Sequence, residues 1–207
     1  MSWHKGERVL IVGLGNPGAR YATTRHNAGF MLADLVADAM GVDVSREKFG
    51  ALFGSGLGWE QRPFVILKPQ TFMNLSGRSV AQAYSFFDLG PERTIVLHDD
   101  IDLPWGDLRV KVGGGHGGHN GLRSIMKETG SGDFVRVRIG IARPDRGDVT
   151  GHVLGAFNDD EWACAEAVFA RGVEAVRVSV TAGPKVAMNQ MNGLFKASSR
   201  QEELQGD

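Results

Sequence analysis

The sequence predicts one α/β domain, in which a sheet packs against helices, and three features indicate this class. Residues 9–12 and 94–98 are short apolar runs, typical of strands that are buried on both faces. Segments with the helical spacing of apolar residues lie between such runs. The chain has 207 residues, of which 42% are hydrophobic, so it can bury one substantial core.

The first half of the chain is expected to contain strands and helices in alternation. Strands are predicted at 9–12, 51–57, 63–67 and 94–98, and helices at about 27–40 and from 76 to just before 90. Asn27 is the expected N-cap of the first helix, and Gly41 suits its left-handed C-terminal position. The strands at 51–57 and 63–67 flank a short turn, so we expect them to be neighbours.

The second half is expected to contribute two strands with paired cations and three helices. The strands lie at 108–112 and 135–141. A short helix starts at 120, and two further helices run from 158 to about 180 and from 185 to 195. The sequence shows no interdomain linker and no internal repeat. We predict a single domain over residues 1–207, with a core at about 7–195 and a flexible tail at 196–207.

The charge distribution predicts one confined basic face. The net charge of −1 argues against a protein that binds nucleic acid over its whole surface. Residues 105–146 nevertheless hold eight Lys or Arg against four acidic residues. Such a local surplus of positive charge suits one anionic partner.

Three sequence features predict the cellular compartment of the protein. The N-terminal segment lacks the apolar stretch of a signal peptide, and no segment approaches the roughly 18 apolar residues of a membrane span. The single cysteine, Cys164, excludes an intramolecular disulfide framework and fits a reducing compartment. We therefore expect a soluble, cytoplasmic protein.

Polar side chains with catalytic potential follow the apolar elements of the predicted domain. They are Asn16, His26, Asn74, Asp99, His119 and Asn120. A histidine that pairs with a carboxylate can take a proton from water near neutral pH, and asparagine amides can hold a carbonyl or an oxyanion without adding charge. This set favours hydrolysis of a carbonyl group, although a single Asn is more often a turn or cap residue.

Other kinds of chemistry are less well supported. The chain has no G-x-S-x-G motif for a serine nucleophile. His116 and His119 have a spacing that could hold zinc, but they lie in a glycine-rich loop without an H-E-x-x-H helix. Gly13 and Gly15 begin a dinucleotide-binding pattern that the following residues do not continue. We therefore expect no metal and no cofactor.

The loop at 113–121 predicts an anion site. It holds six glycines and leads into a helix at Asn120, so its amides could bind a phosphate-sized anion. Arg109, Lys111 and Arg138 are expected to border it, because they project from the polar faces of two strands. The alternative is a flexible connection, since glycine permits any tight path.

Five motifs resemble those of bacterial-type peptidyl-tRNA hydrolases. They are GLGNPG with Tyr21 and TRHNAGF (13–30), KPQTFMNLSG (68–77), HDDIDLPWG (98–106), GGGHGGHNGLRSI (113–125) and FVRVRIGIARP (134–144). The resemblance implies an α/β domain with a mixed, mostly parallel twisted sheet between helices. It also implies hydrolysis of the ester that joins a peptide to the 3′ end of tRNA, without a metal.

The resemblance also assigns roles by position. His26 would be the general base and Asp99 its partner, and three asparagines would hold substrate or water: Asn16, Asn74 and Asn120. Tyr21, Phe72, Met73 and His119 would line the substrate pocket, and Arg109, Lys111 and Arg138 would bind a tRNA phosphate. Two positions depart from the family pattern: Asp100 replaces a glutamate and is expected to be a spectator, and Arg109 replaces a lysine.

The predicted partner is peptidyl-tRNA, with no membrane or protein partner, and the expected state is a monomer. A second hypothesis is an RNA-binding protein on the same scaffold without hydrolase activity. The presence of Asn16, His26 and Asp99 argues against it. A third hypothesis, a metal-dependent nucleotide hydrolase, predicts loss of activity with a chelator.

Overall fold

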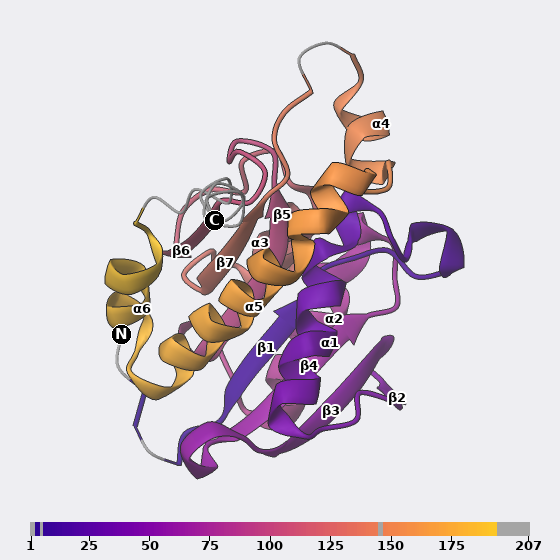
Figure 1. The fold of residues 1–207 in the computed structure, drawn as a ribbon. Coiled ribbons are helices and arrows are strands. Elements are labelled where there is room, and N and C mark those ends of the chain that lie inside the picture. The colour runs from indigo at the N-terminus through magenta and orange to yellow at the C-terminus, as the bar shows by residue number, and fades with distance from the viewer. Residues whose placement is uncertain (1–2, 5, 145–146, 194–207) are drawn as a thin grey trace, which may run out of the picture.

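A computed structural model describes residues 3–4, 6–144 and 147–193, and its centre is one seven-stranded sheet. The strands are β1 (Val9–Gly13), β2 (Arg46–Lys48), β3 (Ala51–Leu57), β4 (Pro63–Pro69), β5 (Thr94–Asp100), β6 (Leu108–Val112) and β7 (Val135–Gly140). They lie in the order β2-β3-β4-β1-β5-β7-β6 (Figure 1). The sheet spans both halves of the sequence, so segments that are distant along the chain pair in its middle.

The middle of the sheet is parallel and its margins are antiparallel. β1 pairs in parallel with β4 and β5, and β5 pairs in parallel with β7. β3 runs against β4, and β6 runs against β7. All five residues of β1 are buried, as expected for a central strand with helices on both faces. The predicted mixed, mostly parallel α/β class is therefore confirmed.

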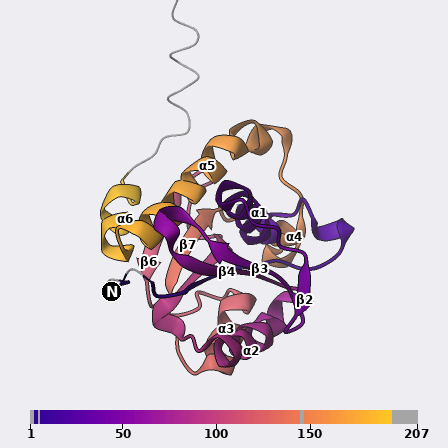
Figure 2. The ribbon, with the colours of Figure 1, turned by 90° about the horizontal axis from the view of Figure 1, so that it is seen from below.

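Helices cover both faces of the sheet (Figure 2). One face carries α1 (Ala28–Met40), α5 (Asp159–Thr181) and α6 (Pro184–Met191), and the other carries α2 (Ser76–Phe87) and α3 (Asn120–Thr129). Each layer buries its own hydrophobic cluster against alternate side chains of the strands. The short helix α4 (Val149–Leu154) lies beside the turn that holds His26.

Most predicted elements are present, with differences at their ends. The neighbouring strands predicted at 51–57 and 63–67 are confirmed, and the second of them continues to Pro69. β5 continues to Asp100, so that Asp99 lies within the strand. β2 and α4 were not predicted, because three exposed residues and a six-residue helix carry little apolar periodicity. The last helix begins at Pro184 and ends at Met191. The predicted tail at 196–207 lies outside the described residues, and the domain bounds stay a prediction.

The two ends of α1 differ in how well the sequence predicted them. Gly41 ends the helix with φ of 64°, as expected for a left-handed C-cap. Asn27 occupies the predicted N-cap position, but its side chain makes no capping bond, because it hydrogen-bonds the backbone of Asn16 instead. An asparagine beside another loop can satisfy that loop's backbone as readily as its own helix.

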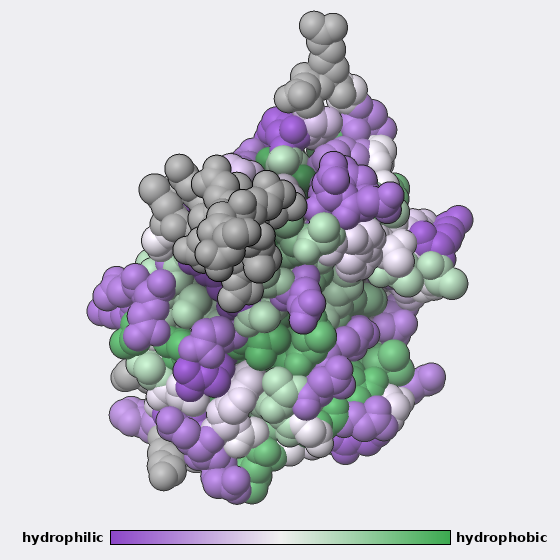
Figure 3. All heavy atoms as spheres, in the orientation of Figure 1, coloured by the Kyte–Doolittle hydropathy of each residue, from purple (hydrophilic) through white to green (hydrophobic). Residues whose placement is uncertain are grey.

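The face that carries α1 and α5 mixes hydrophilic and hydrophobic residues (Figure 3). Leu35 of α1 and Trp162 of α5 are each 41% exposed. Scattered apolar side chains of this kind are ordinary on protein surfaces. Among the described residues, no helix combines the length and apolar character needed to cross a bilayer.

The first turn of α1 approaches the sheet so closely that only glycine fits at position 29. A Cβ on Gly29 would lie 2.3 Å from the carbonyl oxygen of Leu97 and 2.6 Å from that of Leu14. Both carbonyls belong to backbone that cannot rotate away, as a side chain could. Gly29 therefore lets α1, and the turn before it, rest directly on the ends of β1 and β5.

We predict that Gly29→Ala destabilises the protein by about 1–3 kcal/mol, because the helix must shift away from the strands. Urea unfolding would measure this as a lower midpoint. Gly193→Ala is the control, since a Cβ there meets nothing within 4 Å. Equal midpoints for the two variants would contradict the close approach.

Candidate active site

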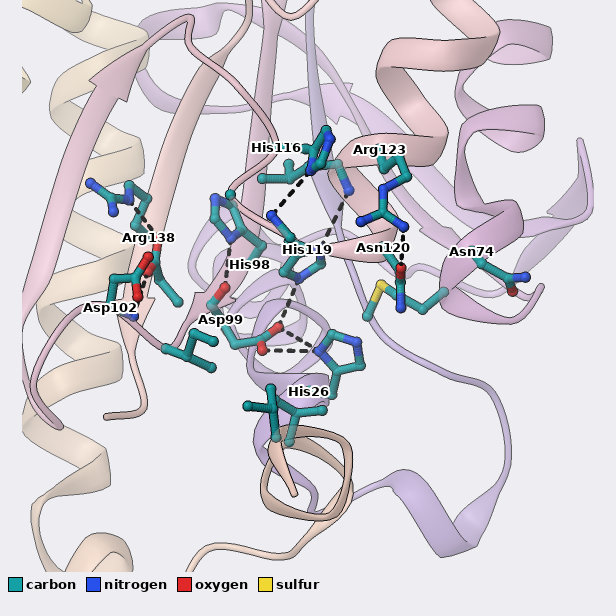
Figure 4. A pocket seen from close by; sticks show the side chains of 18 of the residues that line it. His26, Asn74, His98, Asp99, Asp102, His116, His119, Asn120, Arg123 and Arg138 are labelled. Carbon is teal, nitrogen blue, oxygen red and sulfur yellow. Dashed lines mark hydrogen bonds and ion pairs between the residues drawn. The ribbon is translucent and has the colours of Figure 1, made fainter. Parts of the chain in front are cut away.

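A pocket of about 1070 Å³ opens where β1 and β5 end, and it brings together side chains from distant segments. The predicted site residues that line it are Asn16, Tyr21, His26, Phe72, Met73, Asn74, Asp99, Lys111, His119, Asn120 and Arg138. Figure 4 shows His26, Asp99 and His119 together, with Arg138 to one side and Asn74 to the other. Arg109 is the one predicted site residue that does not line this pocket.

The centre of the pocket is a histidine held by a buried carboxylate. His26 Nδ1 lies 2.9 Å from both carboxylate oxygens of Asp99, and Asp99 is 2% exposed. Because a carboxylate only accepts, Nδ1 carries the proton and Nε2 keeps its lone pair. Among the described residues, no hydrogen bond occupies that Nε2. His26 is thus oriented to accept a proton from a molecule in the pocket.

His119 holds the same carboxylate from the opposite side. Its Nε2 lies 3.0 Å from Asp99 Oδ1, and its Nδ1 accepts from the backbone amides of Gly121 and Leu122. A nitrogen that accepts two N–H groups has no proton, so His119 is neutral with its proton on Nε2. The N-cap of α3 is therefore this histidine, and the helix start fixes its tautomer.

The bonds of His119 bear on two predictions, that it lines the substrate pocket and that the loop at 113–121 binds an anion. Both ring nitrogens are occupied within the protein, so the imidazole lines the pocket without a free polar atom for a ligand. The Gly121 and Leu122 amides, expected to bind an anion, are likewise taken by the His119 side chain. A capping side chain competes directly with an anion for the same orphan amides.

The surroundings of Asp99 keep it ionised and keep a third histidine neutral. Burial alone would raise the pKa of Asp99, but His26 and His119 together hold it well below its usual range. Burial, with the nearby His119, lowers the pKa of His98 to about 3. His98 Nδ1 donates to the carbonyl of Asp99, and its buried Nε2 has no partner among the described residues.

The three predicted asparagines are held to different degrees. Asn16 is buried, and its side-chain oxygen accepts from the amide of Met73 at 2.8 Å, which leaves its NH₂ group for the pocket. Asn120 accepts from Arg123 at 3.2 Å, so its NH₂ group also remains. Asn74 is exposed at the pocket wall. Asn16 is therefore the most rigid amide donor of the three.

The basic end of the pocket differs from the prediction that Arg109, Lys111 and Arg138 together border an anion site. Arg138 donates to Asp100 at 2.7 Å, so Asp100 is not the spectator that was expected. Arg136 is 3% exposed and donates to the carbonyls of Gly114, Gly115 and Gly132, which fixes the glycine-rich loop. Arg109 lies directly opposite Arg138 on the strand pair, but it donates to Asn192 and Asp107.

A metal ion does not fit the histidine–aspartate cluster in this arrangement. One ligand atom each from His26, Asp99 and His119 lies within 4.8 Å of the others, which is close enough in principle. A metal would need the lone pair of His119 Nε2, but that nitrogen carries the proton while Nδ1 caps α3. Metal binding would therefore break the cap of the helix.

Comparisons with known proteins identify the family of this chain. The family model described as peptidyl-tRNA hydrolase matches residues 10–202. A curated peptidyl-tRNA hydrolase from Geobacter sulfurreducens is 51% identical over 183 residues, which cover 88% of this chain and 94% of the relative. One from Trichlorobacter lovleyi is 49% identical over 188 residues, with 90% and 96% covered. The chain belongs to the peptidyl-tRNA hydrolase family.

Solved structures of peptidyl-tRNA hydrolases share the fold. The enzyme from Acinetobacter baumannii is 40% identical and superposes with a TM-score of 0.87, covering 95% of this chain and 100% of its own. An Arg119Gln mutant of that peptidyl-tRNA hydrolase superposes with the same score. The predicted resemblance is thereby confirmed over most of the chain.

Sequence reasoning missed several residues of this peptidyl-tRNA hydrolase site. His98 and Asn27 adjoin the predicted Asp99 and His26, so their position in the motifs was the available signal. Val149 and Val153 of α4 also line the pocket, and their i,i+4 spacing was the only hint. Arg25 donates to both oxygens of Glu161, which ties the His26 turn to the start of α5.

We predict that His98 makes the protein less stable as the pH falls from about 6 to about 4. Its pKa of about 3 in the folded state lies below the roughly 6.5 of an unfolded chain, so only the unfolded state takes up the proton in this range. The free energy of unfolding should fall by about 1.4 kcal/mol per pH unit from this residue. Urea unfolding of His98→Gln should show a shallower decrease than the original protein, and parallel pH curves would contradict the buried neutral state.

Proposed function

We propose how this peptidyl-tRNA hydrolase breaks its ester bond, with His26 as the general base. A water oxygen attacks the ester carbonyl carbon while His26 Nε2 takes a proton from that water. The bond between the carbonyl carbon and the ribose oxygen at the tRNA 3′ end then breaks, and His26 returns the proton to that oxygen. The products are a free peptide acid and a tRNA with a free 3′ hydroxyl, which returns to translation.

The observation that carries the proposal is the pair of hydrogen bonds from His26 Nδ1 to Asp99 at 2.9 Å. The carboxylate fixes the tautomer that leaves Nε2 as a base, and it stabilises the imidazolium that forms during attack. His119 keeps the carboxylate in place through its own bond to Asp99 Oδ1. The base is thus held in position before substrate arrives.

The asparagine amides supply donors without adding a charge. The NH₂ group of Asn16 suits the developing oxyanion or the carbonyl of the substrate, with Asn120 and Asn74 at the same wall for the substrate and the water. Amide donors of this kind match a peptide bond and leave a free ammonium group unsatisfied. We therefore expect a preference for peptidyl-tRNA over aminoacyl-tRNA. Tyr21, Phe72 and Met73 give the pocket its apolar lining.

A tRNA phosphate is proposed to bind at the basic end of the pocket, on Lys111 and Arg138. Both residues line the pocket from neighbouring strands, and Lys111 is exposed. Arg138 donates from its Nε to Asp100, and this bond fixes the orientation of the guanidinium group. Arg109 was predicted to share this role, but its bonds to Asn192 and Asp107 favour a structural one.

The other hypotheses have less support. A non-catalytic RNA-binding protein does not need a histidine held by two bonds to a buried carboxylate, and the similar curated relatives carry the name of the hydrolase. A metal-dependent nucleotide hydrolase needs a free lone pair on His119 Nε2, which the cap of α3 denies. We further propose that the enzyme works as a cytoplasmic monomer without a cofactor or protein partner.

We predict that His26→Ala lowers the rate of ester hydrolysis by about 10²–10⁴, the usual contribution of a positioned base. The measurement follows release of the acyl-amino acid from N-acylaminoacyl-tRNA, with and without EDTA. EDTA should leave the original protein active. His4→Ala is the control, because His4 is an exposed histidine that does not line the pocket. Unchanged release by His26→Ala, or loss of release with EDTA, would contradict the mechanism.

For the phosphate site, we predict that Arg138→Ala raises KM for whole tRNA substrates more than for short 3′ fragments. The fragments lack the distant phosphate, so they should not sense the missing guanidinium. Binding should also become less salt-dependent, by about one unit of log-log slope per lost contact. Arg109→Ala is the matched variant, since Arg109 lies opposite Arg138 on β6 but outside the pocket. Equal effects on whole and short substrates would remove Arg138 from the site.

A further inference from the structure

Asn27 makes two hydrogen bonds that the mechanism above does not use. It is 3% exposed and follows His26 directly in the same 3-10 turn, Arg25–Asn27. Its side-chain oxygen accepts from the amide of Asn16 at 2.8 Å, and its NH₂ group donates to the carbonyl of Asn16 at 3.0 Å. One side chain therefore satisfies both backbone polar groups of a single residue in another loop.

The two bonds, together with one from Met73, leave Asn16 with a single free polar group. The backbone of Asn16 is held by Asn27, and its side-chain oxygen accepts from the Met73 amide at 2.8 Å. The amide oxygen cannot exchange places with the NH₂ group, because the Met73 amide is a donor and needs an acceptor. The NH₂ group of Asn16 is thus the part that faces the pocket, and its position follows the backbone that Asn27 holds.

We propose that Asn27 is a positioning residue that sets the amide donor of Asn16 relative to the base His26. Asn27 and His26 are consecutive in one rigid turn, so a bond from Asn27 to Asn16 links the donor and the base into one unit. The loop of Asn16 is otherwise bounded by Gly15 and Pro17, and Gly18 adopts φ of 102°. Small misplacements of a catalytic group cost large factors in rate, so holding this loop has a direct effect on kcat.

The described residues contain a matched pair of bonds between two residues outside the pocket lining. Asn192 accepts from the amide of Val110 at 2.8 Å and donates to its carbonyl at 2.9 Å, which is the same reciprocal contact on the edge strand β6. Neither Asn192 nor Val110 lines the pocket. Asn192→Ala therefore removes equivalent hydrogen bonds between residues that do not line the pocket. Because Val110 precedes the proposed phosphate ligand Lys111, kcat rather than KM is the control readout for this variant.

The test is a double-mutant cycle on Asn16 and Asn27, measured as kcat and KM for N-acylaminoacyl-tRNA, with single turnovers for the slow variants. Asn16→Ala should lower kcat by about 10²–10³, as expected for loss of an oxyanion donor. Asn27→Ala should lower kcat by about 10-fold or more with little change in KM, since it misplaces that donor. In the Asn16→Ala protein the further change Asn27→Ala should have no effect, because the group it positions is gone.

Three results would overturn the proposal: unchanged kcat in Asn27→Ala, an equal loss from Asn27→Ala with and without Asn16, or an equal loss from Asn192→Ala. Thermal melting checks that each variant is folded. If Asn27→Ala does not fold, Asn27→Asp replaces it, since a carboxylate still accepts from the Asn16 amide but cannot donate to its carbonyl. The inference rests on the proposed function: an inactive original protein contradicts that function, whereas an active one with independent losses contradicts only the role of Asn27.

Discussion

The carboxylate of Asp99 is the constraint on which the rest of the site depends. It is buried at the end of β5 and accepts hydrogen bonds from His26, before α1, and from His119, at the start of α3. An unpaired buried charge would be very costly, so the fold must bring both imidazoles to it. One ionised group thereby joins a central strand to helices on opposite faces of the sheet.

Close backbone contact is what delivers His26 to that carboxylate. Gly29 lets the first turn of α1 lie against the Leu97 carbonyl, two residues before Asp99 on the same strand. His26 and Asn27 form the 3-10 turn immediately before this helix, so the contact fixes both side chains. Asn27 in turn accepts a hydrogen bond from the backbone amide of Asn16, and the Asn16 side chain accepts one from the amide of Met73. His26, Asn16 and Met73 of the pocket wall are therefore parts of one connected structure.

Most cations of the pocket are paired within the protein, which the count of charges along the chain does not show. Asp100 and Asp102 pair with Arg138 and Arg143, and the buried Arg136 is occupied by loop carbonyls. Charge that is already paired contributes less to the binding of a distant anion. Lys111 and the remaining donors of Arg138 thus confine the positive charge of this end to a small area. An area of that size suits the proposed single phosphate better than a long stretch of nucleic-acid backbone.

The sequence by itself determined the α/β class, most strands and helices, and the set of residues around the pocket, because apolar periodicity and polar strand ends are local properties. It did not reveal which hydrogen bond each polar side chain makes. Asn27 holds another loop, His119 caps α3, and Arg109 turns away from Arg138. Those choices depend on which groups arrive nearby when distant segments fold together, and only the tertiary structure decides them.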